Sequence, residues 1–596
     1  MPRYQAPVDE VLFLLSHVLP LAEHKDLPGF SDLSPDMIEA IVREGAKVCE
    51  DFFQPVNYSG DRQGCQRLPD GRVVTPEGFK AAYDAYRKGG WIGLSAPEAY
   101  GGQGLPNTLN HVMGEFTASA NVALSMYGGL TQGAFAALLQ HGGAEQKALY
   151  IPPMIEGRWT GTMNLTEPHC GTDLGLIKTK AIAIEDGSYA ITGQKIFISA
   201  GEHDLSENII HLVLARLSDA PQGTRGISLF LVPKFLVNDD GSLGARNHVN
   251  CGAIEHKMGI HGNATCVMNY EGAKGFLVGE VNRGLQAMFV MMNEARLGVA
   301  IQGLAQSEVA YQNAAVYAKE RLQGRALSGV SAADKPADPI IVHPDIRRML
   351  MDIRSFNEAA RALVIWAAQQ GDIAHRSPDS KAVQRAEDLQ GLLTPVLKGV
   401  LTDIGFDNCV KAQQIFGGHG YVAEWGMEQF VRDARIAMIY EGANGIQALD
   451  LVGRKLPKDG GRAIRTYLEL VGRFIQEREA SADLKPLLSP LKQGLGHLQD
   501  ATLWFMNNAL AKPNHAGAGA YDYMHLFGLV SLGHMWVMMA ESALRLQSQG
   551  IDVQRQHTRL TMASYFMERA MPKTALHLKH ITSGADIMMS LTADSF

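Results

Sequence analysis

The sequence has few charged residues, and it lacks the cysteine patterns of disulfide-rich and zinc-binding proteins. Only 19% of its 596 residues are charged, below the roughly 25% of typical soluble chains, while 46% are hydrophobic. The six cysteines form no CxxC pair and no zinc-ligand spacing, which predicts reduced thiols in a reducing compartment and no metal site. A net charge of −8 gives no electrostatic reason to expect nucleic acid or an anionic membrane as a partner.

The sequence also lacks a convincing signal peptide or membrane span. Its first residues, MPRYQAPVDEVLFLLSHVLP, place an Asp and a Glu before a short apolar run, unlike a signal peptide. The longest uncharged apolar run, residues 524–540, is short for a span and contains two His and two Gly, so it predicts a buried core helix. We therefore expect a soluble, cytoplasmic protein.

Changes in composition along the chain predict a multidomain α+β protein with about four structural units. After an N-terminal extension (1–40), residues 41–160 have helical periodicity, and residues 161–285 consist of short β-type runs bounded by turn residues. Helical periodicity returns in 286–456, with a surface loop near 328–340. Beyond the sequence RKLPKDGG, which is typical of a linker, residues 462–596 form a further helical domain.

Two segments carry residues suited to binding and catalysis. The first runs from Thr162 to Asp173, TMNLTEPHCGTD, and is followed by the strand-like GQKIFIS at 193–199. Its Thr-Glu-Pro turn, closed by Gly-Thr-Asp, would place backbone N–H groups and hydroxyls in a tight loop that can bind a planar heterocycle or a phosphate. The same residue types are also ordinary turn formers, so this segment alone leaves both readings open.

The second segment contains QIFGGHGY at 414–421 and IYEGANGIQ at 439–447. Its glycines allow close approach of a ligand, but the pattern is not the G-x-G-x-x-G of a Rossmann dinucleotide site. Glu441 follows apolar and aromatic residues, and partial desolvation there would raise its pKa toward that of a general base. The alternative is that Glu441 is an N-terminal helix residue favoured by the helix dipole.

Together these motifs resemble the acyl-CoA dehydrogenase family of flavoproteins. The TEPxxGTD loop, GQKIFIS, AKER at 318–321, QIFGGHGY, RDARI and IYEGANGIQ follow the family's order and spacing over about residues 40–455. The resemblance implies a helical domain, a β-barrel-like domain and a four-helix bundle, with FAD between the β domain and the C-terminal helices. The last domain resembles that of enlarged members of about 600 residues, the long-chain and 3-methylmercaptopropionyl-CoA dehydrogenases, which favours a homodimer by analogy.

The resemblance also implies roles for individual residues. Glu441 matches the catalytic base, whose backbone N–H, with Gly442 beside it, meets the substrate, and Arg296 matches a buried arginine that supports the acyl pocket. Thr172 falls at the flavin or the adjoining substrate. The FAD contacts implied are Leu165, Thr166, Phe197 and Ser199 from the β domain, and Arg321, Gln414 and Gly418 from the neighbouring subunit.

The implied reaction converts a saturated acyl-CoA to a trans-2-enoyl-CoA, with Glu441 removing the α proton and the flavin accepting the β hydrogen as hydride. Two segments depart from the family pattern. The family's E-R-x-x-F-G appears as Glu320–Arg325 without the Phe, so stacking on the FAD adenine is not transferred. Ala443–Gly445 replaces Thr-x-Gln, so those FAD contacts are not transferred either.

The sequence does not define the acyl group. A medium- or long-chain fatty acyl-CoA of β-oxidation is the first expectation and 3-(methylthio)propanoyl-CoA the alternative, with an electron-transfer flavoprotein as the implied electron acceptor. An acyl-CoA oxidase would use O₂ instead. A DNA-binding alkylation-response relative would need a basic tail, but residues 457–596 hold 14 Lys and Arg against 12 Asp and Glu without a cluster. A catalytically silent scaffold is disfavoured because Glu441 is present.

Overall fold

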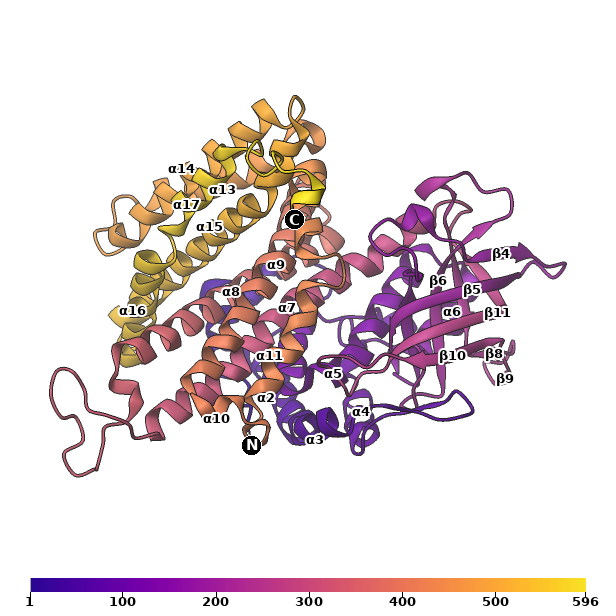
Figure 1. Ribbon diagram of the computed structural model, residues 1–596, viewed down its shortest axis with the longest axis horizontal. Coiled ribbons are helices and arrows are strands. Elements are labelled where there is room, and N and C mark those ends of the chain that lie inside the picture. Colours follow the sequence, from indigo (N-terminus) through magenta and orange to yellow (C-terminus); the bar gives the residue numbers. More distant parts are fainter. Residues whose placement is uncertain (1) are drawn as a thin grey trace. The chain divides into compact units, whose positions relative to one another are not determined.

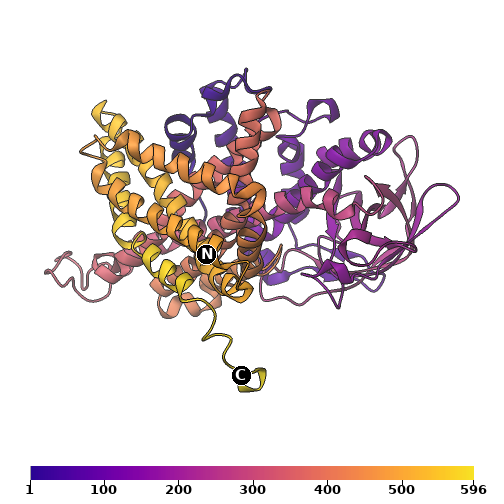
Figure 2. The ribbon, with the colours of Figure 1, turned by 90° about the horizontal axis from the view of Figure 1, so that it is seen from above.

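The computed structural model describes residues 2–596, which form many long helices and one block of strands (Figures 1 and 2). The chain forms two units: a mixed unit, residues 44–298, and a helical unit, residues 1–43 together with 299–596. The division falls inside helix α7 (Gly284–Glu320). This sequence of helices, strands and helices agrees with the predicted α+β class.

The helices of the mixed unit are α3 (Asn57–Gln63), α4 (Phe79–Lys88), α5 (Asn107–His141) and α6 (Ala144–Ile155). Helix α5 is rich in Ala, Leu and Met and is mostly buried. It is interrupted at Asn121, which has φ −163° and ψ 95°. The Asn121 Oδ1 accepts a hydrogen bond from the Leu124 N–H at 3.0 Å, so this side chain caps the second half of the helix.

The strands of the mixed unit close into a barrel-like ring, in which β11 pairs with both β5 and β7, β4 joins β5 to β6, and β6 pairs with β7. The strands β3 and β10 extend the sheet beside β6 and β11. Ile191, Val213 and Phe230 are fully buried inside. The ring and its extensions comprise β3 (Trp159–Asn164), β4 (Lys180–Ala183), β5 (Tyr189–Ser199), β6 (Asn208–Leu217), β7 (Ser228–Pro233), β10 (Val249–Ile254) and β11 (Thr265–Val278).

Smaller elements complete the mixed unit. Two short hairpins lie outside the ring: β1 (Gln66–Arg67) with β2 (Val73–Val74), and β8 (Phe235–Val237) with β9 (Leu243–Arg246). The strand-like GQKIFIS falls in β5 as expected, and β6 covers the apolar run NIIHLVLARL. Its first eight residues are buried, as expected of a central strand covered on both faces.

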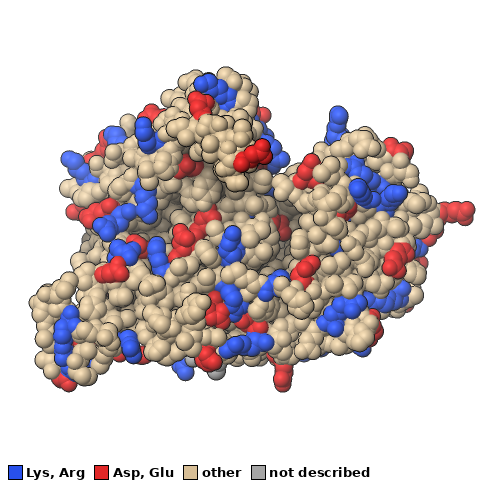
Figure 3. All heavy atoms as spheres, in the orientation of Figure 1, with Lys and Arg blue, Asp and Glu red and all other residues tan. Residues whose placement is uncertain are grey.

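The helical unit contains long helices that pack along one another. The first set comprises α1 (Val8–Phe13), α2 (Pro35–Val48, which ends in the mixed unit), α8 (Pro344–Arg376), α9 (Ser380–Ile415), α10 (Gly418–Tyr421), α11 (Met427–Arg435) and α12 (Asn444–Asp450). The C-terminal set comprises α13 (Arg462–Arg478), α14 (Lys485–Asn508), α15 (Pro513–Ser548), α16 (Val553–Arg569) and α17 (Lys573–Ser583). Charged side chains of both signs are interspersed on the face drawn in Figure 3.

Helix α15 is the core of the C-terminal set and also packs on α8 and α9. Trp536, fully buried, donates from Nε1 to the Ser355 carbonyl of α8 at 2.9 Å. Gly399 of α9 lies so close to the Met524 side chain that a Cβ there would meet Sδ at 2.3 Å. The last helices are therefore packed into the bundle rather than attached by a linker alone.

Two helices, α5 and α15, are long and apolar enough to cross a membrane by length and composition alone, which is weak evidence of a span. Their most apolar 18-residue windows are 67% and 89% buried within the protein. The run 524–540 lies in α15, where its side chains meet other helices, as expected of a core helix.

In the mixed unit, His261 forms an ion pair that depends on pH. Its Nδ1 lies 2.9 Å from the Asp61 Oδ1 and its Nε2 lies 2.8 Å from the Lys257 carbonyl oxygen. Because both ring nitrogens face acceptors, the doubly protonated imidazolium satisfies this site best. The hydrogen bond with Asp61 raises the pKa of His261 from 6.5 to about 9.

We therefore expect this ion pair to stabilise the protein below pH 6.5 and to lose that effect as the pH rises to about 9. The His261→Gln variant should unfold at lower urea concentration than the parent at pH 6, and the difference should vanish above pH 9. The His256→Gln variant is the control, because His256 is exposed and makes no hydrogen bond among the described residues. A His261→Gln difference that does not change with pH would contradict the ion pair.

Candidate functional site

The predicted turn after β3 is present and is anchored by a buried carboxylate. Glu167 and Cys170 exchange two backbone hydrogen bonds of 2.9 and 3.1 Å. The Glu167 carboxylate, 3% exposed, accepts hydrogen bonds from the Lys195 Nζ at 2.8 Å and the Thr179 hydroxyl at 2.6 Å. Burial opposes ionisation of Glu167, but these donors outweigh it and hold the pKa below its ordinary value. The glutamate of the TEP motif is therefore a structural anchor of the loop.

The same lysine brings the loop against the end of β5. Lys195, fully buried in β5, also donates to the Leu165 carbonyl at 2.9 Å, and the Ile196 N–H donates to the Thr166 carbonyl at 2.9 Å. Leu165 and Thr166 therefore lie directly beside Phe197. Burial lowers the pKa of Lys195, and the Glu167 carboxylate opposes that shift.

The end of β5 presents an aromatic ring from a strained backbone. Phe197 has φ 59° and is 59% exposed, at a register shift in the pairing with β11. A positive φ at a non-glycine residue persists only where surrounding structure enforces it, and such residues cluster at functional sites. The hydroxyls of Thr166, Thr172 and Ser199 make no hydrogen bond to any residue that the structure describes. The ring and these hydroxyls are available to a ligand.

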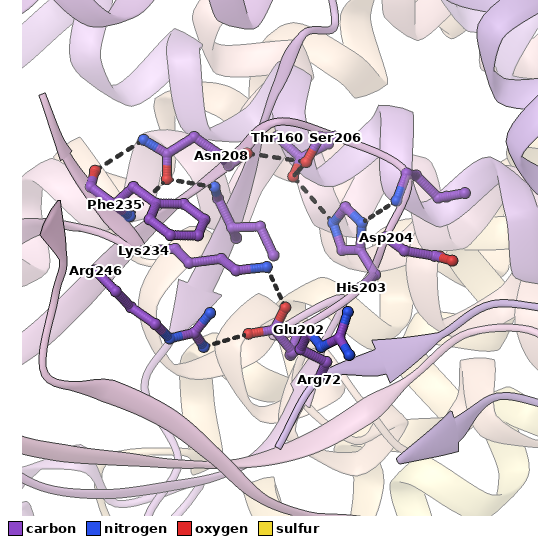
Figure 4. A network of polar contacts seen from close by, with 12 residues as sticks. Arg72, Thr160, Glu202, His203, Asp204, Ser206, Asn208, Lys234, Phe235 and Arg246 are labelled. Carbon is purple, nitrogen blue, oxygen red and sulfur yellow. Dashed lines mark hydrogen bonds and ion pairs between the residues drawn. The ribbon is translucent and has the colours of Figure 1, made fainter. Parts of the chain in front are cut away.

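A buried polar network fixes the segment that follows Ser199 (Figure 4). Glu202, 2% exposed, is held between Lys234 and Arg246, whose Nη2 donates to it at 3.0 Å. The His203 Nδ1 accepts from the N–H two residues further along, so its Nε2 donates to the Thr160 hydroxyl at 3.0 Å. Burial lowers the pKa of His203 well below 6.5, so this ring stays neutral. The network gives the end of β5 a fixed support.

In the helical unit, Glu441 lies in a strained loop before α12. Glu441 has φ 55° and Gly442 has φ 85°, while α12 begins only at Asn444, so Glu441 is not a helix N-terminal residue. The Gln447 Nε2 donates to the carbonyls of Glu441 and Gly442 at 3.0 and 3.3 Å, and the Lys398 Nζ donates to the Gly442 carbonyl at 2.8 Å. Gln447 and Lys398 are both fully buried.

The residue before Glu441 is fixed as well. The Tyr440 hydroxyl donates a hydrogen bond to the Gln302 Oε1 of α7. Burial, and next the Glu441 carboxylate, raise the pKa of Tyr440, so its hydroxyl remains a donor. The half-buried Glu441 carboxylate thus projects from a backbone that is held on both sides.

An aromatic cluster joins the end of α7 to the glycine-rich segment. Tyr317, one turn before Arg321, stacks on Phe416 with centroids 4.1 Å apart and hydrogen-bonds to the His419 Nδ1 at 2.8 Å. His419 in turn stacks on Trp425 at 4.3 Å. This cluster brings Arg321 near the segment that carries Gln414 and Gly418.

That neighbourhood has an open backbone and an unpaired cation. A Cβ built at Gly417 or Gly418 would meet no atom within 4 Å, and Gly417 has φ 57°, which favours glycine. Gln414 and Arg321 are exposed, and the Arg321 guanidinium has no ion pair or hydrogen bond with any described residue. An unpaired arginine beside an accessible backbone is suited to a phosphate group.

The loop after Arg321, where the sequence departs from the family pattern, is held by a buried carboxylate. The fully buried Asp338 accepts hydrogen bonds from the N–H groups of Ala326, Ser331 and Ala332, and from the Arg325 Nη1 at 3.2 Å. These hydrogen bonds, that of the Ala326 N–H first, lower the pKa of Asp338 against the effect of burial. Asp338 therefore organises the loop of residues 322–340, with Arg325 as one of its donors.

The predicted residues fall into groups within each unit. Leu165, Thr166, Phe197 and Ser199 are adjacent in the mixed unit, with Thr172 exposed in the same loop, and Arg296 is buried in α7. In the helical unit, Arg321 is near Gln414 and Gly418, while Glu441 and Gly442 form a separate loop.

Sequence reasoning missed the side chains that hold these segments. Three of them, Glu167, Lys195 and Gln447, lie inside the motifs already recognised; the others are Lys398 and Tyr317.

Comparisons with known proteins cover nearly the whole chain. Residues 71–158, 162–273 and 282–456 match the N-terminal, middle and C-terminal domains of acyl-CoA dehydrogenases, and residues 467–592 match the acetyl-CoA dehydrogenase C-terminal-like domain. A 3-methylmercaptopropionyl-CoA dehydrogenase of Ruegeria pomeroyi is 40% identical over 98% of this chain and 99% of its own. The chain belongs to the acyl-CoA dehydrogenase family.

Other members of the family are similar over nearly the full length. A broad-specificity linear acyl-CoA dehydrogenase of Mycobacterium tuberculosis, FadE5, is 32% identical over 96% of both chains. Two solved structures share the fold at lower identity. Caenorhabditis elegans ACDH-11 with C11-CoA has a TM-score of 0.80 at 17% identity, covering 99% of this chain and 96% of its own. An acyl-CoA dehydrogenase of Bacillus anthracis complexed with FAD has a TM-score of 0.72 at 21%, covering 96% and 91%.

The predicted family, fold class and enzyme class are therefore confirmed, and this acyl-CoA dehydrogenase family member is an FAD-dependent oxidoreductase of acyl-CoA. Its residues fit the cofactor. The exposed Phe197 ring and the free hydroxyls around it suit the planar isoalloxazine, and the free Arg321 beside Gly418 suits the diphosphate. When bound, FAD supplies the acceptor for a hydride.

We expect Arg321→Gln to weaken FAD binding. Loss of a charge-assisted hydrogen bond of about 1.5–3 kcal/mol corresponds to roughly a 10- to 100-fold higher Kd. Titration of the apoprotein with FAD, followed by flavin fluorescence, measures this change. Arg473→Gln is the control, because Arg473 is also exposed and unpaired among the described residues but lies in α13. Equal Kd values for the two variants would remove Arg321 from the FAD site.

Proposed function

We propose that this protein catalyses α,β-dehydrogenation of a saturated acyl-CoA, with Glu441 as the base that removes the α proton. The observation that carries the proposal is the held loop: Glu441 has a left-handed backbone, and buried donors bind its own carbonyl and the next one. Such strain persists where a side chain must be aimed. The reaction class follows from the family, and the role of Glu441 from its motif.

The residues of the chain have defined tasks in this reaction. The proton α to a thioester is weakly acidic, so a carboxylate can remove it only if the carbonyl oxygen is polarised at the same time. Donors aimed at an oxygen that gains negative charge contribute about 3–4 kcal/mol each in measured cases. We assign one such donor to the Glu441 N–H. Arg296 supports the acyl pocket, and Thr172 lies at the substrate.

We favour a linear medium- or long-chain fatty acyl-CoA of β-oxidation as substrate, which agrees with the broad linear specificity named for the mycobacterial relative. The second candidate, 3-(methylthio)propanoyl-CoA, is favoured by the activity named for the relative that is 40% identical. We further infer a cytoplasmic homodimer in which Arg321, Gln414 and Gly418 complete the partner's FAD site. An electron-transfer flavoprotein is the inferred electron acceptor.

Glu441→Gln should abolish most turnover while FAD stays bound. The amide keeps the size of the side chain but cannot accept the proton, and general-base catalysis contributes about 10²- to 10⁴-fold. The measurements are steady-state turnover with a dye acceptor and the flavin absorbance of the purified protein. Glu424→Gln, an exposed residue of the 3₁₀ turn Ala423–Trp425, is the control. Full activity of Glu441→Gln would end the proposal.

A panel of thioesters distinguishes the substrates. Butanoyl-, octanoyl-, hexadecanoyl- and 3-(methylthio)propanoyl-CoA are each mixed with the oxidised enzyme without oxygen, and loss of flavin absorbance is followed in a single turnover. We expect octanoyl- or hexadecanoyl-CoA to bleach the flavin fastest. Faster bleaching by 3-(methylthio)propanoyl-CoA would favour the second candidate instead. Hydrogen peroxide formed in air in stoichiometric amounts would identify an oxidase.

A further inference from the structure

A chain of buried and partly buried hydrogen bonds connects the C-terminal helix α15 to the loop that carries Glu441. We propose that Tyr521 and His525 of α15 are positioning residues for this loop, acting through Asp403 and Asn444. The inference rests on the proposed role of Glu441, and it gives the C-terminal helices a part in the reaction. All of these residues belong to the helical unit.

The first link is the Asp403 carboxylate of α9, which is 7% exposed. Its Oδ2 accepts hydrogen bonds from the Tyr521 hydroxyl at 2.5 Å and the His525 Nε2 at 2.9 Å. Its Oδ1 accepts from the Asn444 Nδ2 at 2.7 Å. Burial favours the neutral acid, but the donors from α15 outweigh it and keep the pKa of Asp403 below its ordinary value. Helix α15 thus keeps this buried group ionised.

The second link is the Asn444 side chain, three residues after Glu441 and 5% exposed. Its Nδ2 faces Asp403, and its Oδ1 accepts from the Lys398 Nζ at 2.7 Å. This orientation is fixed, because a flipped amide would place its NH₂ against an ammonium and its oxygen against a carboxylate. The Nδ2 also donates to the Thr402 Oγ1 at 2.9 Å and the Gly399 carbonyl at 3.2 Å, so the Asp403 carboxylate is the charged and shortest of the three acceptors that hold this side of Asn444.

The third link is Lys398, whose ammonium also donates to the Gly442 carbonyl at 2.8 Å. Lys398 is fully buried, so its charge needs both acceptors, and Asn444 sets where the ammonium lies. The Gly442 carbonyl belongs to the Gly442–Ala443 peptide unit, so Lys398 holds the residue that follows Glu441. Movement of Lys398 would leave the Gly442 carbonyl held only by the longer hydrogen bond from Gln447, loosen the left-handed backbone of Glu441 and Gly442, and let the Glu441 carboxylate turn away from its direction of attack.

The test removes donors from α15 and leaves the loop sequence unchanged. Tyr521→Phe deletes one hydroxyl, and Tyr521→Phe with His525→Leu deletes both donors to the Asp403 Oδ2. Tyr523→Phe is the matched control, because its fully buried hydroxyl, on the same helix, bonds instead to the Thr502 Oγ1 at 2.8 Å. His525→Gln keeps an N–H donor and tests for rescue.

Two readouts are compared on FAD-loaded enzyme: kcat and KM with the fastest thioester of the panel, and amide hydrogen exchange of peptides covering residues 436–450. A displaced catalytic group costs up to about 100-fold in rate. We expect Tyr521→Phe to lower kcat about threefold and the double variant about tenfold, with KM changed less than twofold and faster exchange in the loop. Tyr523→Phe should lower the melting temperature yet keep kcat and loop exchange, and His525→Gln should stay close to the parent.

The outcomes separate this inference from the proposed function. If Tyr521→Phe and the double variant match Tyr523→Phe in kcat and loop exchange, the positioning role is wrong even when Glu441→Gln is inactive. If Glu441→Gln keeps its turnover, the proposed function is wrong whatever the loop exchange shows. If the double variant does not retain FAD, the single Tyr521→Phe variant decides by the same two readouts.

Discussion

The hydrogen bonds from buried side chains to the carbonyls of Glu441 and Gly442 are the constraint on which the proposed chemistry depends. Two successive left-handed residues, one of them not glycine, cost about 1–3 kcal/mol of backbone strain at the non-glycine position. Without contacts to the rest of the protein, a loop with this backbone would relax to an unstrained conformation. Gln447 and Lys398 prevent this, because each would lose a hydrogen bond inside the protein if the carbonyls turned away. Relief of the backbone strain would therefore leave buried polar side chains without hydrogen bonds.

The mixed unit uses the same device. Lys195, as fully buried as Lys398, donates to the Leu165 carbonyl at 2.9 Å and supports the loop beside the strained Phe197. Each buried ammonium also has a polar partner: the Glu167 carboxylate for Lys195, and the Asn444 amide for Lys398. In both units, therefore, a lysine on a strand or helix holds a loop that carries predicted site residues. The loop is restrained because the strand or helix that carries the lysine is rigid.

The sequence predicts those parts of the fold and the candidate site that depend on local residue pattern. The strand β6 and the turn at Glu167–Cys170 follow from their own residue types, and the motifs indicated the family and Glu441. The partners across the fold could not be predicted. Lys398 stands alone in the apolar segment PVLKGVL, and nothing in the sequence shows that its ammonium meets a carbonyl 44 residues away. Tyr521 and Asp403 are 118 residues apart, and only the packing of α15 on α9 makes them neighbours.

The packing of α15 changes how the last helices should be understood. A domain attached only through a linker could be exchanged or removed without consequence for the loop of Glu441. Here the Trp536 indole satisfies a carbonyl of α8, the Met524 side chain lies against Gly399 one residue after Lys398, and two side chains of α15 satisfy Asp403. Loss of the Tyr521 and His525 donors with α15 still in place would leave that carboxylate buried without them, and its pKa would rise. Ionisation of the group that orients Asn444 would then be less favourable, so the packing of the bundle and the proposed positioning of Glu441 share one set of contacts.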